Sequence, residues 1–158
     1  MTDFDALYNT YAPDVFRFAM YLSGNRADAE DITSETFVRA WTAPGPIAMA
    51  TVKGYLLTIA RNLFLHGLRK TSRNVPLDDR MRDSHPGPET EAEMKADYRA
   101  IVAELQQLPE IDRAALLMSA FEDMTYDEIS RALGISVPAI KMKIHRSRLK
   151  LSRIMEAK

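Results

Sequence analysis

The segment from 125 to 153 constrains the fold most strongly, because it carries start and stop signals for two consecutive helices. Thr125 stands three residues before Glu128, which is the spacing of a capping box that opens a helix. Gly134 suits the left-handed position just after a helix ends. Ser136 can cap a second helix, and Pro138 falls within its first turn. The segment therefore predicts two helices joined by a tight glycine turn, a helix-turn-helix.

The second of these helices has the charge pattern of a DNA-recognition helix. It has no acidic residue between 137 and 153, and its basic residues are Lys141, Lys143, Arg146, Arg148, Lys150 and Arg153. One narrow apolar stripe carries Ile140, Ile144, Leu151 and Ile154. The opposite, outer face carries Pro138, Met142, His145 and Leu149. An apolar seam with basic flanks favours docking in a major groove; the alternative is an ordinary surface helix with solvated lysines.

Net charge alone would argue against a nucleic-acid partner, because the chain of 158 residues carries a formal charge of −1. The distribution of charge reverses that argument. Residues 41–77 contain five basic and no acidic residues, and residues 137–158 contain seven basic and one acidic residue. Acidic segments, including 101–136, separate these two blocks, and they either face a basic partner or keep the chain soluble.

Several function classes find no support in the sequence. The chain has no cysteine, which excludes disulfides and thiolate chemistry. No apolar run approaches the length of a membrane span, so we expect a cytoplasmic protein without membrane insertion. The three histidines are scattered, and no phosphate-binding loop or hydrolase motif occurs. We therefore expect no enzyme activity, no metal, no cofactor and no small-molecule substrate.

The whole chain is expected to be all-α, with two small helical domains joined by a flexible linker. Apolar residues recur at helical spacing over 3–22, where Pro13 predicts a break or the start of a second helix, and over 26–41, 52–71, 93–108 and 110–122. Phe37 and Trp41 are expected in the core. The polar, proline-containing stretch 74–92 predicts a linker between an N-terminal domain, 1–73, and a C-terminal domain, 93–158.

Three segments in order resemble the extracytoplasmic-function group of bacterial sigma factors. AEDITSETFVRAW at 29–41 is similar to that family's AED-x-x-QETF-x-RAW stretch. GYLLTIARNLFLHGLRK at 54–70 is similar to its W-L-x-x-I-A-R-N helix. The segment 105–151, with LPEIDR followed by EISRALGIS, is similar to its C-terminal helix-turn-helix region. The likeness covers nearly the whole chain except the linker.

The resemblance implies an alternative sigma factor that binds core RNA polymerase and promoter DNA and is held by an anti-sigma factor. Polymerase binding is implied for the acidic helix 26–41, through Asp28, Asp31, Glu35 and Arg39. Minus-ten binding is implied for Lys53, Tyr55, Arg61, Asn62, His66, Arg69, Lys70 and Arg73, with a flipped base captured by the loop 42–51. Minus-thirty-five binding is implied for Ser136, Pro138, Ala139, Lys141, Met142, Lys143, His145, Arg146 and Arg148.

This sequence departs from the family pattern at a few of these positions. His66 stands where the family has aspartate and Ser34 where it has glutamine. Pro138 and Ala139 replace a Gly-Thr pair, and Met142 replaces a serine, so two hydroxyl contacts to DNA are lost. Two other functions stay open: a helix-turn-helix regulator that acts without polymerase, and a sigma-like decoy that titrates an anti-sigma factor.

Overall fold

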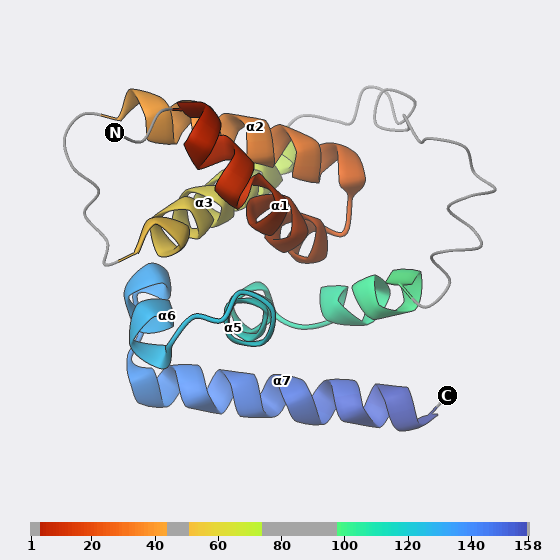
Figure 1. The fold of residues 1–158 in the computed structure, drawn as a ribbon. Helices are drawn as coiled ribbons and strands as arrows, with labels where there is room; N and C mark the ends of the chain where they lie inside the picture. Colours follow the sequence, from red (N-terminus) through yellow and green to blue (C-terminus); the bar gives the residue numbers. More distant parts are fainter. Residues whose placement is uncertain (1–3, 44–50, 74–97, 158) are drawn as a thin grey trace.

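The N-terminal half of the protein is a bundle of three helices in the computed structural model, which describes residues 4–43, 51–73 and 98–157. These helices are α1 (Phe4–Ser23), α2 (Arg26–Thr42) and α3 (Val52–Arg73), and each packs against the other two (Figure 1). The predicted amphipathic helix over 26–41 is confirmed, because its face of Ala29, Ile32, Thr33, Thr36 and Phe37 is buried. The predicted linker, 74–92, lies outside the described residues.

The C-terminal half begins with a helical segment over 98–106 and continues with three further helices. These are α5 (Glu110–Ala120), α6 (Tyr126–Leu133) and α7 (Val137–Ala157). Figure 1 shows α7 on the side of this half that faces away from the α1–α3 bundle. No strand occurs in the three described ranges, so the all-α fold expected from the sequence is confirmed.

The local signals of the helix-turn-helix are confirmed atom by atom. The Glu128 backbone N–H donates to Thr125 Oγ1 at 3.1 Å, and the Thr125 N–H donates to Glu128 Oε1 at 2.8 Å. Gly134 has φ +72° and donates its N–H to Ser130 at 2.8 Å, which ends α6. Ser136 Oγ accepts from the Ala139 N–H at 3.3 Å at the start of α7. The capping box thus defines the start of α6, and the Gly134 and Ser136 contacts define the turn from α6 into α7.

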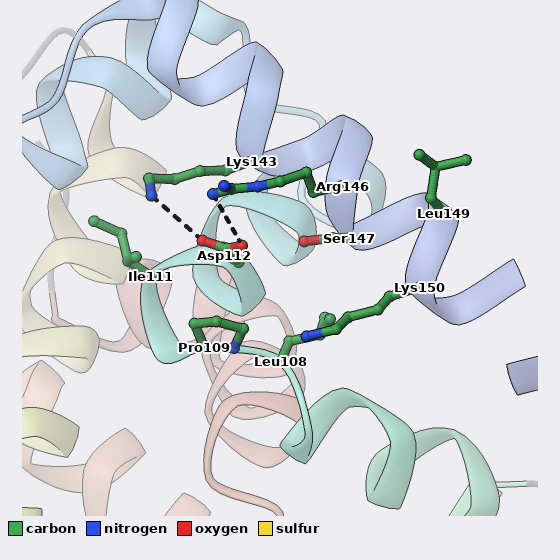
Figure 2. A pocket seen from close by; sticks show the side chains of 9 residues that line it. All are labelled: Leu108, Pro109, Ile111, Asp112, Lys143, Arg146, Ser147, Leu149 and Lys150. Carbon is green, nitrogen blue, oxygen red and sulfur yellow. Dashed lines mark hydrogen bonds and ion pairs between the residues drawn. The ribbon is translucent and has the colours of Figure 1, made fainter. Parts of the chain in front are cut away.

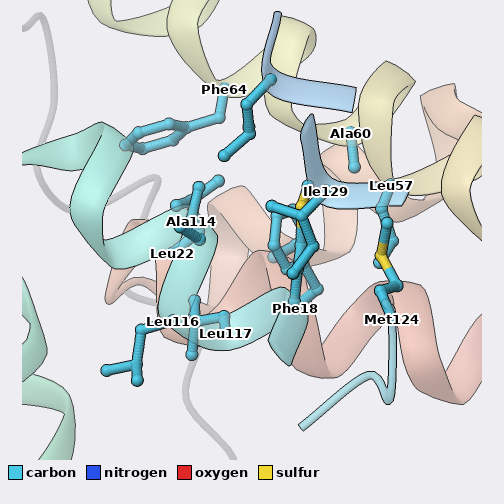
Figure 3. Packing of buried hydrophobic residues seen from close by; sticks show 14 of the residues in the cluster. Phe18, Leu22, Leu57, Ala60, Phe64, Ala114, Leu116, Leu117, Met124 and Ile129 are labelled. Atoms are coloured by element: carbon cyan, nitrogen blue, oxygen red, sulfur yellow. The ribbon is translucent and has the colours of Figure 1, made fainter. Parts of the chain in front are cut away.

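One continuous hydrophobic core joins the two halves. Helix α1 packs against α5, and α3 packs against α6. Figure 3 shows Phe18 and Leu57 from the N-terminal bundle beside Leu117 and Ile129 from the C-terminal half. All four side chains are buried. Burial of such side chains contributes about 1.5–3 kcal/mol each, so the apolar interface holds the halves together.

Two expectations about the N-terminal bundle were wrong. Pro13 does not break the first helix, because α1 runs through it. Proline removes one backbone hydrogen bond, but the buried Val15 and Phe18 in the next turn anchor α1 to the core. Trp41 is not a core residue, since it is 55% exposed. It lies at the end of α2, where the Phe4 ring contacts it edge-on at 5.3 Å between centroids.

Candidate nucleic-acid interfaces

The outer face of α7 is open to solvent and cationic along its flanks. Ile140 and Ile144 are buried against the rest of the C-terminal half, as the predicted stripe requires. The exposed residues on the other faces are Pro138, Lys141, Met142, His145, Arg146, Arg148, Leu149 and Lys150. Among the described residues, Lys141, His145 and Arg148 have no ion-pair partner. Cations in this position can neutralise DNA phosphates without first breaking an internal contact.

Two of the predicted DNA-contacting cations on α7 are tied to a buried carboxylate. Lys143 Nζ lies 3.4 Å from Asp112 Oδ1, and an Arg146 terminal nitrogen lies 3.5 Å from Asp112 Oδ2. Asp112 is only 5% exposed and belongs to the first turn of α5. Its charge also suits the positive end of that helix. Lys143 and Arg146 therefore stabilise the packing of α7 on α5, in addition to any contact with DNA.

A pocket of about 470 Å³ lies where the start of α5 meets the second half of α7. Figure 2 shows the Asp112 ion pairs at its centre and Leu149 pointing away from them. Its lining comprises Leu108, Pro109, Ile111, Asp112, Lys143, Arg146, Ser147, Leu149 and Lys150. Ser147 Oγ is buried there without a hydrogen-bond partner in the described part of the chain. The pocket is thus partly apolar and partly cationic.

The predicted minus-ten residues on α3 separate into two faces. At about 100° per residue, Tyr55, Asn62 and His66 fall on one side of the helix, away from Lys53 and Arg61. Asn62 and His66 are exposed and Tyr55 is half-buried. The side chains of Arg69, Lys70 and Arg73 and most of the loop 42–51 lie outside the described residues.

The face of α3 that carries Lys53 and Arg61 is neutralised by carboxylates of the C-terminal half. Arg61 donates two hydrogen bonds of 2.7 Å to the two carboxylate oxygens of Glu110, the first residue of α5. Lys53 Nζ donates to the Glu122 carbonyl oxygen at 3.1 Å and lies 3.6 Å from Glu122 Oε1. A bidentate arginine pair is among the stronger ionic contacts in proteins. Two cations that could meet DNA phosphates are therefore occupied by carboxylates in this arrangement.

Glu122 is the most buried charge in this contact. It follows α5, is 1% exposed, and accepts from Arg17 Nε at 3.0 Å and from Arg17 Nη2 at 2.9 Å. Burial raises the pKa of Glu122 above its ordinary value, while the Arg17 hydrogen bonds act in the opposite direction. The same contact raises the pKa of Arg17. No local pattern in the sequence indicates this pairing, because Arg17 and Glu122 are 105 positions apart.

A buried arginine adds a second polar link between the halves. Arg113 Nε donates to the Leu22 carbonyl at the end of α1 at 3.0 Å, and Nη1 donates to the Leu108 carbonyl at 2.8 Å. Burial lowers the pKa of Arg113 below its ordinary value. Gln106 Nε2 donates to the Tyr21 carbonyl at 2.8 Å nearby. The bonds to Leu22 and Tyr21 satisfy carbonyl groups that the end of α1 leaves without helical partners.

The predicted polymerase-binding residues lie on the exposed side of α2. Asp31, Glu35 and Arg39 are exposed, and Arg39 Nε lies 3.1 Å from Glu35 Oε2. Asp28 is half-buried in the first turn, where its N–H donates to the Asn25 side chain at 2.9 Å. Val38, which was not among the residues expected from the sequence, is 51% exposed on the same side as Asp31 and Glu35. Its apolar side chain in an acidic face could have been noticed from the helical spacing alone.

The described residues contain no cluster of three or more histidine or carboxylate side chains that could hold a metal ion. Their helices also include none that is long and apolar enough to cross a membrane.

Comparison with known proteins assigns both halves to one family. Residues 7–74 match Sigma-70 region 2, and residues 98–151 match region 4 of the same family. The protein therefore belongs to the sigma-70 family, whose members are transcription initiation factors rather than enzymes. Within it, the chain belongs to the extracytoplasmic-function group, as its relatives show.

Two relatives and one solved structure illustrate the match. The chain is 36% identical over 159 residues to the ECF RNA polymerase sigma factor SigE of Mycolicibacterium smegmatis, covering 96% of this chain and 61% of SigE. It is 32% identical over 152 residues to EcfG of Rhodopseudomonas palustris, covering 90% of this chain and 80% of EcfG. The fold matches that of RpoE from Bartonella quintana, solved with the anti-sigma factor NepR, with a TM-score of 0.79, 23% identity, and coverage of 99% and 98% of the two chains.

Proposed function

We propose that the protein is an alternative sigma factor that brings core RNA polymerase to a set of promoters in the cytoplasm. The exposed face of α2, with Asp31, Glu35 and Val38, contacts the polymerase. The outer face of α7 reads the minus-thirty-five element. The exposed side of α3, with Asn62 and His66, meets the minus-ten strand. The protein supplies promoter recognition and strand capture, and the polymerase supplies the chemistry.

The observation that carries this proposal is a helix-turn-helix whose two helices are both capped, together with an outer face of α7 that carries only positive charge. Lys141 and Arg148 lie on one flank of α7, and the exposed Lys150 lies on the other. Such a helix binds duplex DNA through phosphates on both flanks while its outer face approaches base edges. A surface helix that only keeps the protein soluble has no need for this exclusion of acidic residues from 137 to 153.

The closed packing of the two halves adds a step to this function. Arg61 and Lys53 cannot bind phosphate oxygens while Glu110 and Glu122 hold them. Engagement of the minus-ten strand through these cations therefore requires the C-terminal half to move off α3. Binding to polymerase and to two separated promoter elements provides the free energy for that movement. An anti-sigma factor that binds both halves would keep the protein closed.

The test is run-off transcription with purified core polymerase on fragmented genomic DNA, with and without the protein. Defined new transcripts that start downstream of a common sequence motif are expected. A matched variant, Lys141→Ala with Arg148→Ala, should lose the transcripts and still bind the polymerase. Polymerase binding without transcripts would favour a decoy for an anti-sigma factor. Tight duplex binding with no polymerase binding would favour a regulator that acts alone.

A further inference from the structure

An apolar ridge runs along the middle of the cationic face of α7. At about 100° per residue, Pro138, Met142 and Leu149 lie within one narrow sector of the helix, with His145 beside them. Met142 is 61% exposed and Leu149 is 47% exposed. The cations stand on both sides of this ridge: Lys141 and Arg148 on one, Lys143, Arg146 and Lys150 on the other.

Met142 and Leu149 of this ridge lie in different surroundings. Leu149 is in the second half of α7 and lines the pocket beside α5. Met142 is in the second turn of α7, close to the turn at Gly134. In helix-turn-helix proteins the first turns of the recognition helix reach the base edges, and later turns pass over the backbone. Pro138 in the first turn and Met142 in the second are therefore the apolar residues in position to meet bases, and Met142 has the longer and more flexible side chain.

The thioether side chain of methionine can form few favourable hydrogen bonds with base edges. Its sulfur is only a weak acceptor, and the side chain donates no hydrogen bond. The C5-methyl group of thymine is the apolar group that the bases present in the major groove. The flexible, unbranched side chain of methionine can adapt its conformation to the position of that methyl group. The cations on both flanks would meanwhile hold the helix to the two phosphate backbones.

We propose that Met142 determines part of the promoter specificity by packing against a thymine methyl group in the minus-thirty-five element. The inference rests on the proposed sigma-factor function and adds the base that this helix selects. The element then contains thymine at the base pair facing the second turn of α7. Lys141 and Arg148 contribute affinity through phosphates, without regard to that methyl group.

The rival occupant of the ridge is an acidic amphipathic helix from a protein partner. Such a helix would match apolar side chains between two cationic flanks. The position of Met142 in the second turn of a capped recognition helix favours DNA, because that turn reaches base edges. The two occupants differ in one respect that can be measured, since only DNA responds to removal of a methyl group from a base.

The experiment uses the full chain with core polymerase and a duplex pool randomised over the minus-thirty-five region. After selection, each thymine of the bound sequence is replaced singly by deoxyuridine, which removes the methyl group and keeps the base pair. At one position the replacement should weaken wild-type binding about fourfold, the effect of losing one buried methyl group. Met142→Ser should bind the thymine duplex about as weakly as the wild type binds the deoxyuridine duplex, and should show no further loss on the latter.

Two controls separate this contact from general effects. Met142→Leu keeps an apolar side chain and should keep the preference for thymine. Lys141→Gln should weaken binding to both duplexes equally and reduce the salt dependence.

Selection of a site that lacks thymine, or indifference to deoxyuridine at every position, would overturn the inference and leave the sigma-factor function standing. Failure to select any sequence would overturn both. An equal deoxyuridine effect in Met142→Ser would assign the methyl contact to another residue and overturn the inference.

Discussion

The protein has two basic helices, α3 and α7. Both lie in basic segments of the sequence, but the fold places their cations in different surroundings. On α7, Lys141 and Arg148 are exposed without ion-pair partners in the described part of the chain. On α3, Arg61 and Lys53 are held by Glu110 and Glu122 from the other half. The α7 cations Lys141 and Arg148 are therefore available to DNA, whereas carboxylates already neutralise the cations of α3. The comparison shows that positive charge in the sequence identifies a potential phosphate-binding surface, and that only the packing determines whether it is accessible.

The largest expected effect comes from the accessible surface. Replacement of Lys141 and Arg148 by alanine should weaken duplex binding by about 10- to 100-fold, because two phosphate contacts are lost. The slope of log affinity against log salt should fall by about two units. Thermal unfolding should change little, since neither residue contacts the core. Fluorescence anisotropy over a salt series measures the binding, and an unchanged salt slope would show that this flank does not face DNA.

A second expected effect distinguishes the two kinds of cation on α7 itself. Replacement of both Lys143 and Arg146 by alanine leaves the buried Asp112 without its cationic partners. The free energy of unfolding should fall by about 1–3 kcal/mol as a result. Urea unfolding measures the loss, and Asp112→Asn in the same background should recover part of it. The Lys141 and Arg148 variant is the matched control, because it removes the same charge from the same helix.

Release of Arg61 from its carboxylate partner should have the opposite effect and should strengthen binding to nucleic acid. Glu110→Gln removes one charge of the bidentate pair with Arg61. Binding of a mixed-sequence single-stranded oligonucleotide by the isolated protein should then tighten about threefold, as expected for a partly exposed ion pair. Glu30→Gln changes the net charge equally on α2 and does not touch α3. An equal gain of affinity in both variants would show that the effect comes from net charge and not from the pair with Arg61.

The smallest expected effect is a pH dependence centred on Glu122. Burial raises the pKa of this carboxyl group in the folded protein above its value in the unfolded chain. Its contribution to stability is therefore fully present below the unfolded pKa and is lost as the pH rises through the folded pKa. Relative to the wild type, Glu122→Gln should become progressively more stable from acidic to neutral pH. Urea unfolding of both proteins over that range measures the difference, and the opposite trend would mean that Arg17 outweighs burial.

Sequence reasoning succeeded where the determinants are local. Thr125, Glu128 and Gly134 act within one helix and its ends, so their roles followed from spacing alone. The burial of Ile140 and Ile144 likewise followed from periodicity. The expectations for Pro13 and Trp41 were wrong because tertiary packing decided both positions: α1 continues as one helix through the proline, and the end of α2 leaves the indole exposed.

The contacts between the halves could not be predicted from the sequence. Arg61 and Glu110 are 49 positions apart, and Lys53 and Glu122 are 69 apart. Periodicity describes one helix at a time and says nothing about which helices meet. The charge blocks contained a partial signal, because the basic segment 41–77 is followed by the acidic segment 101–136. That complementarity is compatible with a partner protein as well as with an internal contact, and only the fold distinguishes them.

The most direct test of this account is the distance between the two halves before and after the protein binds polymerase and promoter. The chain has no cysteine, so Glu30→Cys on α2 and Arg131→Cys on α6 provide two exposed positions for a fluorescent donor and acceptor. Energy transfer should be high in the free protein and should fall when core polymerase and a promoter fragment are added. The labelled protein must still direct run-off transcription. Unchanged transfer during active transcription would contradict the account, because Glu110 and Glu122 would still cover Arg61 and Lys53.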